Sequence, residues 1–347
     1  MKGALRKFVI TALIFVLFVQ LSFQLYLNKR PSDVQSLHLL LNKSNTPRRN
    51  PISILNKVTR EDVRLHPFPH IVIKNALQPS LYKALERGYP TYQEIIRTRF
   101  GKDMKISPNV RIDVPAAAVL NSKILSQEWH KFVKFHTSNT FFKEIIDVFE
   151  EAIGLYLGGF ESLYGKIHEH IQTGVRGLGS TKYTDLLLDA QIGINTPVVG
   201  DPSRVRGIHI DNCQEVFAAL LYFRDSSDQS EGGELELYEC IQTECSEYSM
   251  SERDFLSKKL GWDVQYDETK FKKVDTIPYE PNQLVLFING PHSFHAVTPR
   301  TKSSYPRRLV NILGEGSLAT QMANKKRKQM KRMRNRNYQL SKICNIS

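Results

Sequence analysis

Residues 207–239 read GIHIDNCQEVFAALLYFRDSSDQSEGGELELYE and combine two kinds of pattern. The apolar run at 217–223 and the alternating run at 233–239 predict two β-strands, which a charged loop and a Gly-Gly pair separate. Ahead of them, His209 and Asp211 lie two residues apart, and in an extended segment such residues face the same way. This stretch therefore predicts sheet structure with an imidazole and a carboxylate on one side of a strand end.

Further strand-forming runs lie on both sides of this stretch. They are short, rich in strand formers and bounded by turn residues: LLLDAQIGIN (186–195), QLVLFIN (283–289), SFHAVTP (293–299) and RRLVNIL (307–313). Together with RGIHID and a short piece near DTIPYE, they predict about eight strands. The segment 240–275 interrupts this pattern and is longer than an ordinary connection, which is typical of a lid or a binding loop.

The residues before these strands have mainly helical patterns. HPFPHIVIKNAL (66–77) predicts one strand, and SLYKALERGYP (80–90) predicts a short helix. The runs at 119–135 and 141–157 repeat apolar residues at helical spacing and predict amphipathic helices that lie on a sheet. Helices followed by packed strands predict an α+β fold: a double-stranded β-helix (jelly-roll) core with supporting N-terminal helices.

The front of the chain has the pattern of a membrane segment. Residues 8–27 carry no charge, and a helix of that length matches a hydrocarbon layer of about 30 Å. A cleaved signal peptide is the alternative, but its apolar part is usually about 7–15 residues and ends in small residues, which are missing here. We expect one retained transmembrane helix, a cytosolic tip, and a body in a lumen (ER or Golgi) or a periplasm.

The sequence divides into five parts on these grounds. They are the tip and signal anchor at 1–30, a stem or linker at 31–65, a strand with helical support at 66–180, the jelly-roll core at 181–316 with the insert 240–275, and a basic tail at 317–347.

The net charge of +13 comes from the two ends of the chain. Residues 1–50 supply +7 and residues 325–347 supply +9, which leaves −3 for the middle. No specific nucleic-acid binding by the body is therefore implied. The membrane would be a partner through 8–27, and the basic run at 325–336 is a candidate to bind polyanions or to remain solvated.

The four cysteines do not form a zinc-binding pattern, because no two have the spacing of such a site. Cys240 and Cys245 are near enough in sequence to be bridged in an oxidising compartment. Two free thiols are the alternative, and the sequence leaves both open.

A second histidine completes a candidate metal site. His295 lies in the strand-forming run 293–299, downstream of His209 and Asp211. Two histidines and one carboxylate on sheet ends are the donor set of non-haem iron(II) oxygenases. Three protein ligands leave three coordination positions of an octahedral ion open for catalysis.

The order and spacing of five segments resemble the 2-oxoglutarate- and iron(II)-dependent dioxygenases, in particular the prolyl-4-hydroxylase-like branch. The segments are HID (209–211), LLYFRD (220–225), SEGGELELYE (230–239), LVLFINGPHSFHAVTP (284–299) and RRLVNI (307–312), within about 185–316. The resemblance implies an oxidoreductase that uses Fe(II), 2-oxoglutarate and O2 and releases succinate and CO2; it also admits ascorbate.

The resemblance assigns the three metal ligands and makes them the catalytic residues. His209, Asp211 and His295 would hold Fe(II). His292 competes for the distal position, but the family pattern fits FHAVTP better at His295, and Gly-Pro places His292 in a turn.

A cation is needed for the far carboxylate of 2-oxoglutarate, and Arg307 and Arg308 are the candidates. They face opposite sides of a strand, and we choose Arg307 because it shares its face with the polar Asn311. Tyr222 resembles the tyrosine that helps to bind 2-oxoglutarate in this branch. Gln191 and Asn195, four residues apart on one strand, share a face and are candidates to line the cavity.

These expectations combine into a membrane-anchored dioxygenase that hydroxylates a peptidyl, prolyl-like or other organic substrate. The alternative is a jelly-roll binding module without catalysis. The sequence does not identify the substrate.

Overall fold

The computed structural model describes residues 49–157, 159, 166–179, 184–212, 214–241, 268–290 and 292–316. The expected membrane segment 8–27, residues 31–48 of the expected stem, the middle of the insert and the basic tail lie outside this part of the chain. Within the described residues, none of the helices has the length and apolar character needed to span a bilayer.

The helices precede most of the strands, as the sequence predicts. The α-helices are α3 (Pro79–Arg87), α4 (Tyr92–Phe100), α5 (Ala116–Asn121), α6 (Gln127–His136) and α7 (Asn139–Leu157), with short 3-10 turns at Arg60–Asp62, His168–His170 and Glu268–Lys270. Their ends follow from local chemistry. The Thr91 hydroxyl accepts the Glu94 amide at the start of α4, and Gly101, with φ 73°, ends that helix.

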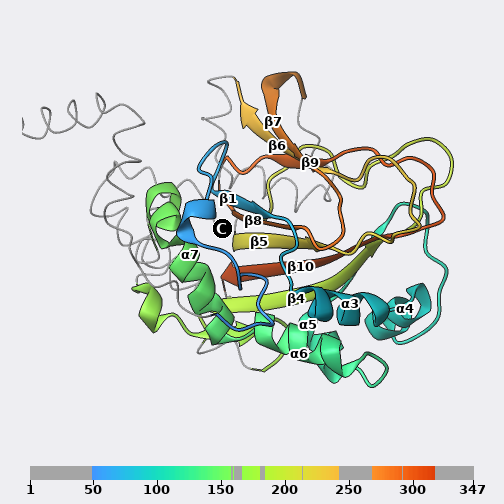
Figure 1. Ribbon diagram of the computed structural model, residues 1–347, viewed down its shortest axis with the longest axis horizontal. Coiled ribbons are helices and arrows are strands. Elements are labelled where there is room, and N and C mark those ends of the chain that lie inside the picture. The colour runs from blue at the N-terminus through green and yellow to red at the C-terminus, as the bar shows by residue number, and fades with distance from the viewer. Residues whose placement is uncertain are drawn as a thin grey trace, which may run out of the picture. The chain divides into compact units, whose positions relative to one another are not determined.

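The larger sheet has seven strands. Its order is β1 (His70–Ile73), β8 (Leu284–Ile288), β5 (Glu215–Tyr222), β10 (Arg307–Gly316), β4 (Leu186–Asn195) and β2 (Arg111–Val114), and β3 (Thr173–Val175) also pairs with β4. Every pair is antiparallel except β3–β4. Figure 1 shows the central strands in this order, with the smaller sheet above them and the helices α3, α5 and α6 on the opposite side.

The smaller sheet has three strands, in the order β7 (Phe271–Ile277), β6 (Leu235–Cys240) and β9 (His295–Val297). The segment around His209 extends it, because His209 forms an antiparallel bridge with His295. From β4 to β10 the chain therefore passes repeatedly from one sheet to the other. Only β6 and β7 follow each other along the chain within the same sheet. This alternation is the arrangement of a double-sheet jelly roll.

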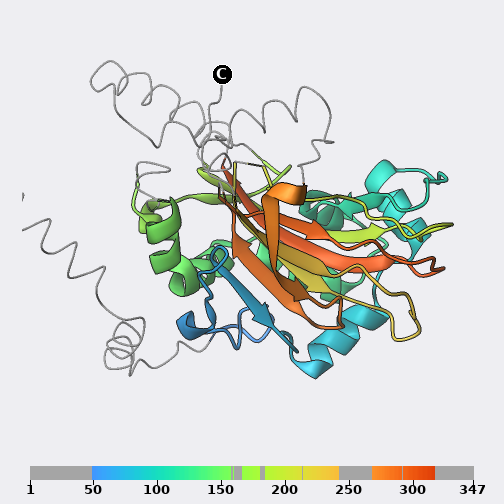
Figure 2. The same cartoon turned by 90° about the horizontal axis from the view of Figure 1, so that it is seen from above.

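Two hydrophobic layers lie on the two faces of the larger sheet. Between the sheets, Leu309 and Ala218 pack with Leu237, Ile277 and other apolar residues. On the opposite face, Val310 and the neighbouring strand residues that point toward the helices pack against helical residues that include Trp129, Phe132 and Phe149. Figures 1 and 2 place α7 near one end of the strands and α4 near the other. The frame is thus a helix layer, a large sheet and a small sheet.

The structure differs from the expected elements at several places. The single helix predicted at 119–135 is wrong, because α5 ends at Asn121 and α6 begins only at Gln127, where the Ser126 hydroxyl caps it by accepting the Trp129 amide. The strand predicted around 209–211 is one isolated bridge. The end of the supposed insert 240–275 is strand β7, which begins at Phe271.

Candidate metal centre

Three side chains from two distant segments meet at the edge of the smaller sheet. One potential ligand atom from each of His209, Asp211 and His295 lies within 4.8 Å of the others. The Nε2 atoms of the two histidines are 3.6 and 3.7 Å from the same Asp211 oxygen, Oδ1. The structure therefore brings together the three residues that the sequence singled out.

Backbone pairing sets the distance between the two histidines. The His209 amide donates to the His295 carbonyl at 2.9 Å, and the His295 amide donates to the His209 carbonyl at 2.9 Å. The two imidazoles consequently lie beside each other, with ring centroids 4.2 Å apart. Asp211, two residues after His209, reaches the same point.

Each imidazole is oriented by a backbone carbonyl two residues earlier. Nδ1 of His209 is 2.7 Å from the Gly207 oxygen, and Nδ1 of His295 is 2.8 Å from the Ser293 oxygen. A carbonyl only accepts, so both Nδ1 atoms carry the proton and donate. The Nε2 lone pairs of both rings are then available to a metal ion, the arrangement typical of ligating histidines.

The electrostatics favour two neutral imidazoles and one carboxylate. Burial, aided by His295, lowers the pKa of His209 to about 4, and burial also lowers the pKa of His295. Burial alone would raise the pKa of Asp211, but His295, His209 and Arg206 outweigh it and lower the pKa. At neutral pH the site thus presents two nitrogen donors and one anionic oxygen donor, which fits a divalent transition metal such as Fe(II).

Arg307 lies deep between the sheets, only 2 % exposed, on the face that also carries Leu309. Its Nε donates to the Gly233 carbonyl at 2.9 Å, and its guanidinium carbon lies 4.9 and 5.0 Å from the ring centroids of Tyr222 and Tyr279. Its Nη2 is buried without a hydrogen-bond partner. A buried donor without a partner is costly, so this position fits an anionic ligand.

Arg308 faces the helix layer instead. Its Nε donates to the Phe223 carbonyl at 2.8 Å, it pairs with Asp225 at 3.1 Å, and it lies over the Tyr89 ring. The structure therefore separates the two arginines as the strand alternation predicts.

Tyr222 and Asn195, both next to Arg307, are among the other buried side chains that have a polar atom without a partner. The Tyr222 side chain is fully buried, and burial raises the pKa of its hydroxyl although the neighbouring Arg307 opposes that rise; no acceptor or donor lies within hydrogen-bonding geometry of the hydroxyl. Asn195 is paired in register with Arg307 across β4 and β10, and its Oδ1 is likewise without a partner. The Tyr222 hydroxyl and the Arg307 guanidinium can both donate to a carboxylate ligand, whereas Asn195 Oδ1 can only accept a hydrogen bond.

Gln191 shares the inner face with Asn195, but both ends of its amide are used. Its Nε2 donates to Asp189 at 2.8 Å, and its Oε1 accepts from Asn311 at 3.3 Å. It stays a lining residue rather than a free ligand group.

The rival histidine is not part of the cluster. The three ligand atoms that lie together are those of His209, Asp211 and His295, while His292 is exposed and its amide donates to the Tyr156 hydroxyl. His136 is buried in the helix layer, and His168 pairs with Glu150.

Two residues of the site escaped the sequence analysis. Asn289 Nδ2 donates to the Asn212 and Glu215 carbonyls at 2.8 and 3.0 Å, which ties the strand before His295 to the segment after Asp211. The Ser293 hydroxyl donates to Asn289 Oδ1 at 2.8 Å. In the sequence these two residues flank Gly-Pro in NGPHS (289–293), a pattern that by itself predicts only a turn.

Cys240 is disulfide-bonded, but the other three cysteines lie outside the described residues, so the Cys240–Cys245 pairing stays a prediction.

No family model matches the chain, and no curated protein matches it. Solved structures do resemble it. A prolyl 4-hydroxylase from Phytophthora capsici has 15 % identity and a TM-score of 0.40, over 79 % of this chain and 68 % of that one. A prolyl hydroxylase from Trichoplax adhaerens, in complex with a hypoxia-inducible-factor peptide, has 12 % identity and a TM-score of 0.34, over 83 % and 94 %.

A third structure is the non-haem α-ketoglutarate-dependent carbocyclase SnoK of nogalamycin biosynthesis. It has 12 % identity and a TM-score of 0.38, over 71 % of this chain and 79 % of that one. These are the kinds of enzyme that the sequence motifs resemble.

Proposed function

We propose that this protein is an Fe(II)- and 2-oxoglutarate-dependent dioxygenase. The observation that carries the proposal is the convergence of His209, Asp211 and His295 with both Nε2 lone pairs available. The unpartnered Arg307 Nη2 between the sheets supports it, because a dicarboxylate cosubstrate needs a cation as well as a metal.

Each residue has a distinct task in this proposal. His209, Asp211 and His295 would hold Fe(II), which with 2-oxoglutarate and O2 supplies oxidation of a substrate C–H bond with release of succinate and CO2. Arg307 would bind the far carboxylate of 2-oxoglutarate through its unused N–H group. The Tyr222 hydroxyl, kept protonated by burial, would donate to the same carboxylate.

The buried setting supports the chemistry. His209 and His295 are 8 % and 4 % exposed, so the protein supplies a site from which bulk water is largely excluded. For the substrate we propose a peptidyl, prolyl-like side chain, on the basis of the motif resemblance. Ascorbate is retained as an accessory reductant on the same basis.

We also propose that the protein is a single-pass membrane protein whose body lies in a lumen or periplasm. The uncharged segment 8–27 and the disulfide at Cys240 support this placement. Attraction of the basic run 325–336 to polyanions is part of the same proposal.

Conversion of 2-oxoglutarate to succinate tests the enzyme proposal. The purified chain with Fe(II) and candidate lumenal proteins should produce succinate and an oxygen adduct on a substrate, seen by mass spectrometry. Asp211→Ala should abolish both, and His292→Ala, on the loop beside the site, should retain both. A jelly-roll binding module without catalysis would give no succinate with any substrate and would be indifferent to Asp211→Ala.

A further inference from the structure

The group that orients Arg307 is the backbone carbonyl of Gly233, which lies in a loop. Arg307 Nε donates to the Gly233 oxygen at 2.9 Å, whereas Nη2 is buried without a hydrogen-bond partner. The direction of the guanidinium therefore depends on where the loop 224–233, between β5 and β6, places Gly233. The role inferred for this loop rests on the proposed function of Arg307.

The end of the loop passes unusually close to the segment that follows β9. Gly232 and Gly233 have φ values of 84° and 85°, a conformation that favours glycine. A Cβ on Gly232 would clash with the Pro299 carbonyl, and one on Gly233 would press on the Arg307 side chain. The loop can lie this close to the Pro299 carbonyl only because Gly232 lacks a side chain.

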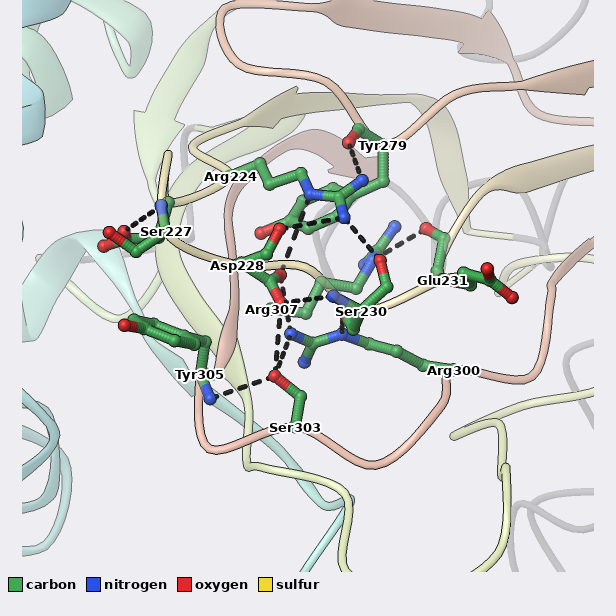
Figure 3. Close-up of polar contacts among 12 residues, drawn as sticks. Arg224, Ser227, Asp228, Ser230, Glu231, Tyr279, Arg300, Ser303, Tyr305 and Arg307 are labelled. Carbon is green, nitrogen blue, oxygen red and sulfur yellow. Dashed lines mark hydrogen bonds and ion pairs between the residues drawn. The ribbon is translucent and has the colours of Figure 1, made fainter.

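A buried ion pair holds the loop in this approach. Arg300, next to Pro299, donates through Nη2 to Asp228 at 2.7 Å and through Nε to the Ser230 hydroxyl at 2.8 Å. The Arg300 and Asp228 side chains are 4 % and 0 % exposed. Figure 3 shows Asp228 between Arg300 and Arg224, with Ser303 at the same carboxylate.

Further contacts hold the loop together and fix it to neighbouring segments. Arg224 Nη2 donates to the Asp228 and Ser230 carbonyls, and Arg224 Nη1 donates to the Tyr279 carbonyl at 3.3 Å. Asp228 Oδ1 accepts the Ser230 amide and the Ser303 hydroxyl, each at 3.1 Å. Loss of the Asp228 charge would leave buried guanidinium groups without their anion, which is strongly unfavourable.

We propose that the buried Arg300–Asp228 pair is a positioning device for the cosubstrate. It fixes the loop 224–233 so that the Gly233 carbonyl aims Arg307 at the far carboxylate of 2-oxoglutarate. Arg300 and Asp228 do not touch the ligand and act through Arg307. The device also links β9, which carries His295, to β10, which carries Arg307, because Arg300 lies on the connection between these strands.

The chain offers a matched control in the same loop. Asp225 also pairs with an arginine of this region, but that arginine is Arg308, which faces the helix layer. Asp228→Asn and Asp225→Asn each remove one negative charge, at positions three residues apart. If the pair serves only stability, both variants will lower the melting temperature and neither will selectively change cosubstrate binding.

The experiment measures two dissociation constants on the full chain. Mn(II) binding and then 2-oxoglutarate binding to the Mn(II)-loaded protein are followed by titration calorimetry. Asp228→Asn should weaken the binding of 2-oxoglutarate by about tenfold, as is typical of residues that orient a ligand-binding group. Its dissociation constant for Mn(II) should stay within about twofold of the wild-type value. Asp225→Asn should leave both constants within about twofold of the wild type. Equal 2-oxoglutarate constants for the two variants would overturn the proposal.

Two further variants keep the test decisive. In an Arg307→Ala background, Asp228→Asn should add no further loss of 2-oxoglutarate affinity, and an additive loss would contradict action through Arg307. Should Asp228→Asn not fold, Ser230→Ala removes one contact of Arg300 and should weaken 2-oxoglutarate selectively by about threefold; an unchanged constant would overturn the inference. Failure of the wild type to bind 2-oxoglutarate would instead reject the proposed function itself.

Discussion

At the scale of single residues, the alternation of one strand separates two adjacent arginines into different environments. Arg307 lies between the sheets with an unused Nη2, whereas Arg308 uses its Nε and pairs with Asp225. In the sequence, only the polar character of Asn311 distinguishes the face of Arg307 from that of Arg308. That choice agrees with the observed faces, because strand periodicity fixes the side of a residue whenever the strand itself is correctly predicted.

Arg307→Lys should weaken 2-oxoglutarate by about tenfold or more while leaving the metal affinity unchanged. A lysine keeps the charge but lacks the planar fork and cannot both hold the Gly233 carbonyl and present a second N–H to the ligand. Titration of the Mn(II)-loaded protein measures the effect, with Arg308→Lys as control. An equal loss in the two variants would refute the assignment of Arg307.

Ser293→Ala should lower the metal affinity by about tenfold, because the Ser293 hydroxyl anchors the turn whose carbonyl orients His295. Ser53 is a matched control: it is also fully buried, donates to a side-chain oxygen of Glu144 and accepts a backbone amide, but it lies in the helix layer. Both variants should lose stability, and only Ser293→Ala should bind Mn(II) more weakly in a calorimetric titration. Unchanged binding by Ser293→Ala would exclude this anchoring role.

At the scale of elements, strands were predicted better than helix boundaries. The runs at 186–195 and 307–313 correspond closely to β4 and β10 because buried strands are continuous apolar segments with clear turns at their ends. Helical periodicity ran across the break between α5 and α6, since Leu125 remains buried there although it is not helical. The short strand β2 was missed because only two of its four residues, RIDV, are apolar, whereas the equally short β1 has a continuous apolar run.

His136 couples the helix layer to the segment that precedes β1, and it makes stability depend on pH. Its Nδ1 donates to the Phe132 carbonyl and its Nε2 accepts the Ile54 amide, so the ring is neutral. Burial lowers its pKa from 6.5 to about 3. Between these values the unfolded chain binds a proton that the folded chain does not, and stability present above pH 6.5 is lost as the pH falls.

Urea unfolding should therefore show that the wild type loses about 2 kcal/mol more stability than His136→Asn between pH 7 and pH 5. Gln127→Asn, a change at an exposed and non-titrating position of the same helix, should keep the wild-type dependence. If His136→Asn and the wild type lose stability equally over this range, the neutral buried state of His136 is wrong.

At the scale of the whole molecule, the jelly roll joins ligands that the sequence separates widely. The 209–211 segment and β9 become neighbours because the chain alternates between two sheets, and the β6–β9 and His209–His295 pairings then set their register. The identities of all three candidate ligands followed from the sequence. Their distances did not, since these depend on strand order, and neither did the support from Asn289 and Ser293, whose partners are mainly backbone carbonyls and leave no pattern in the sequence.

Metal binding by the full chain tests the central claim most directly. Titration with Mn(II) should give one ion per chain, and His209→Ala, Asp211→Ala and His295→Ala should each weaken binding by more than about a hundredfold, beyond the range typical of residues that only support a ligand. His292→Ala should bind Mn(II) as the wild type does. Wild-type affinity in His295→Ala, or loss of binding in His292→Ala, would contradict the account.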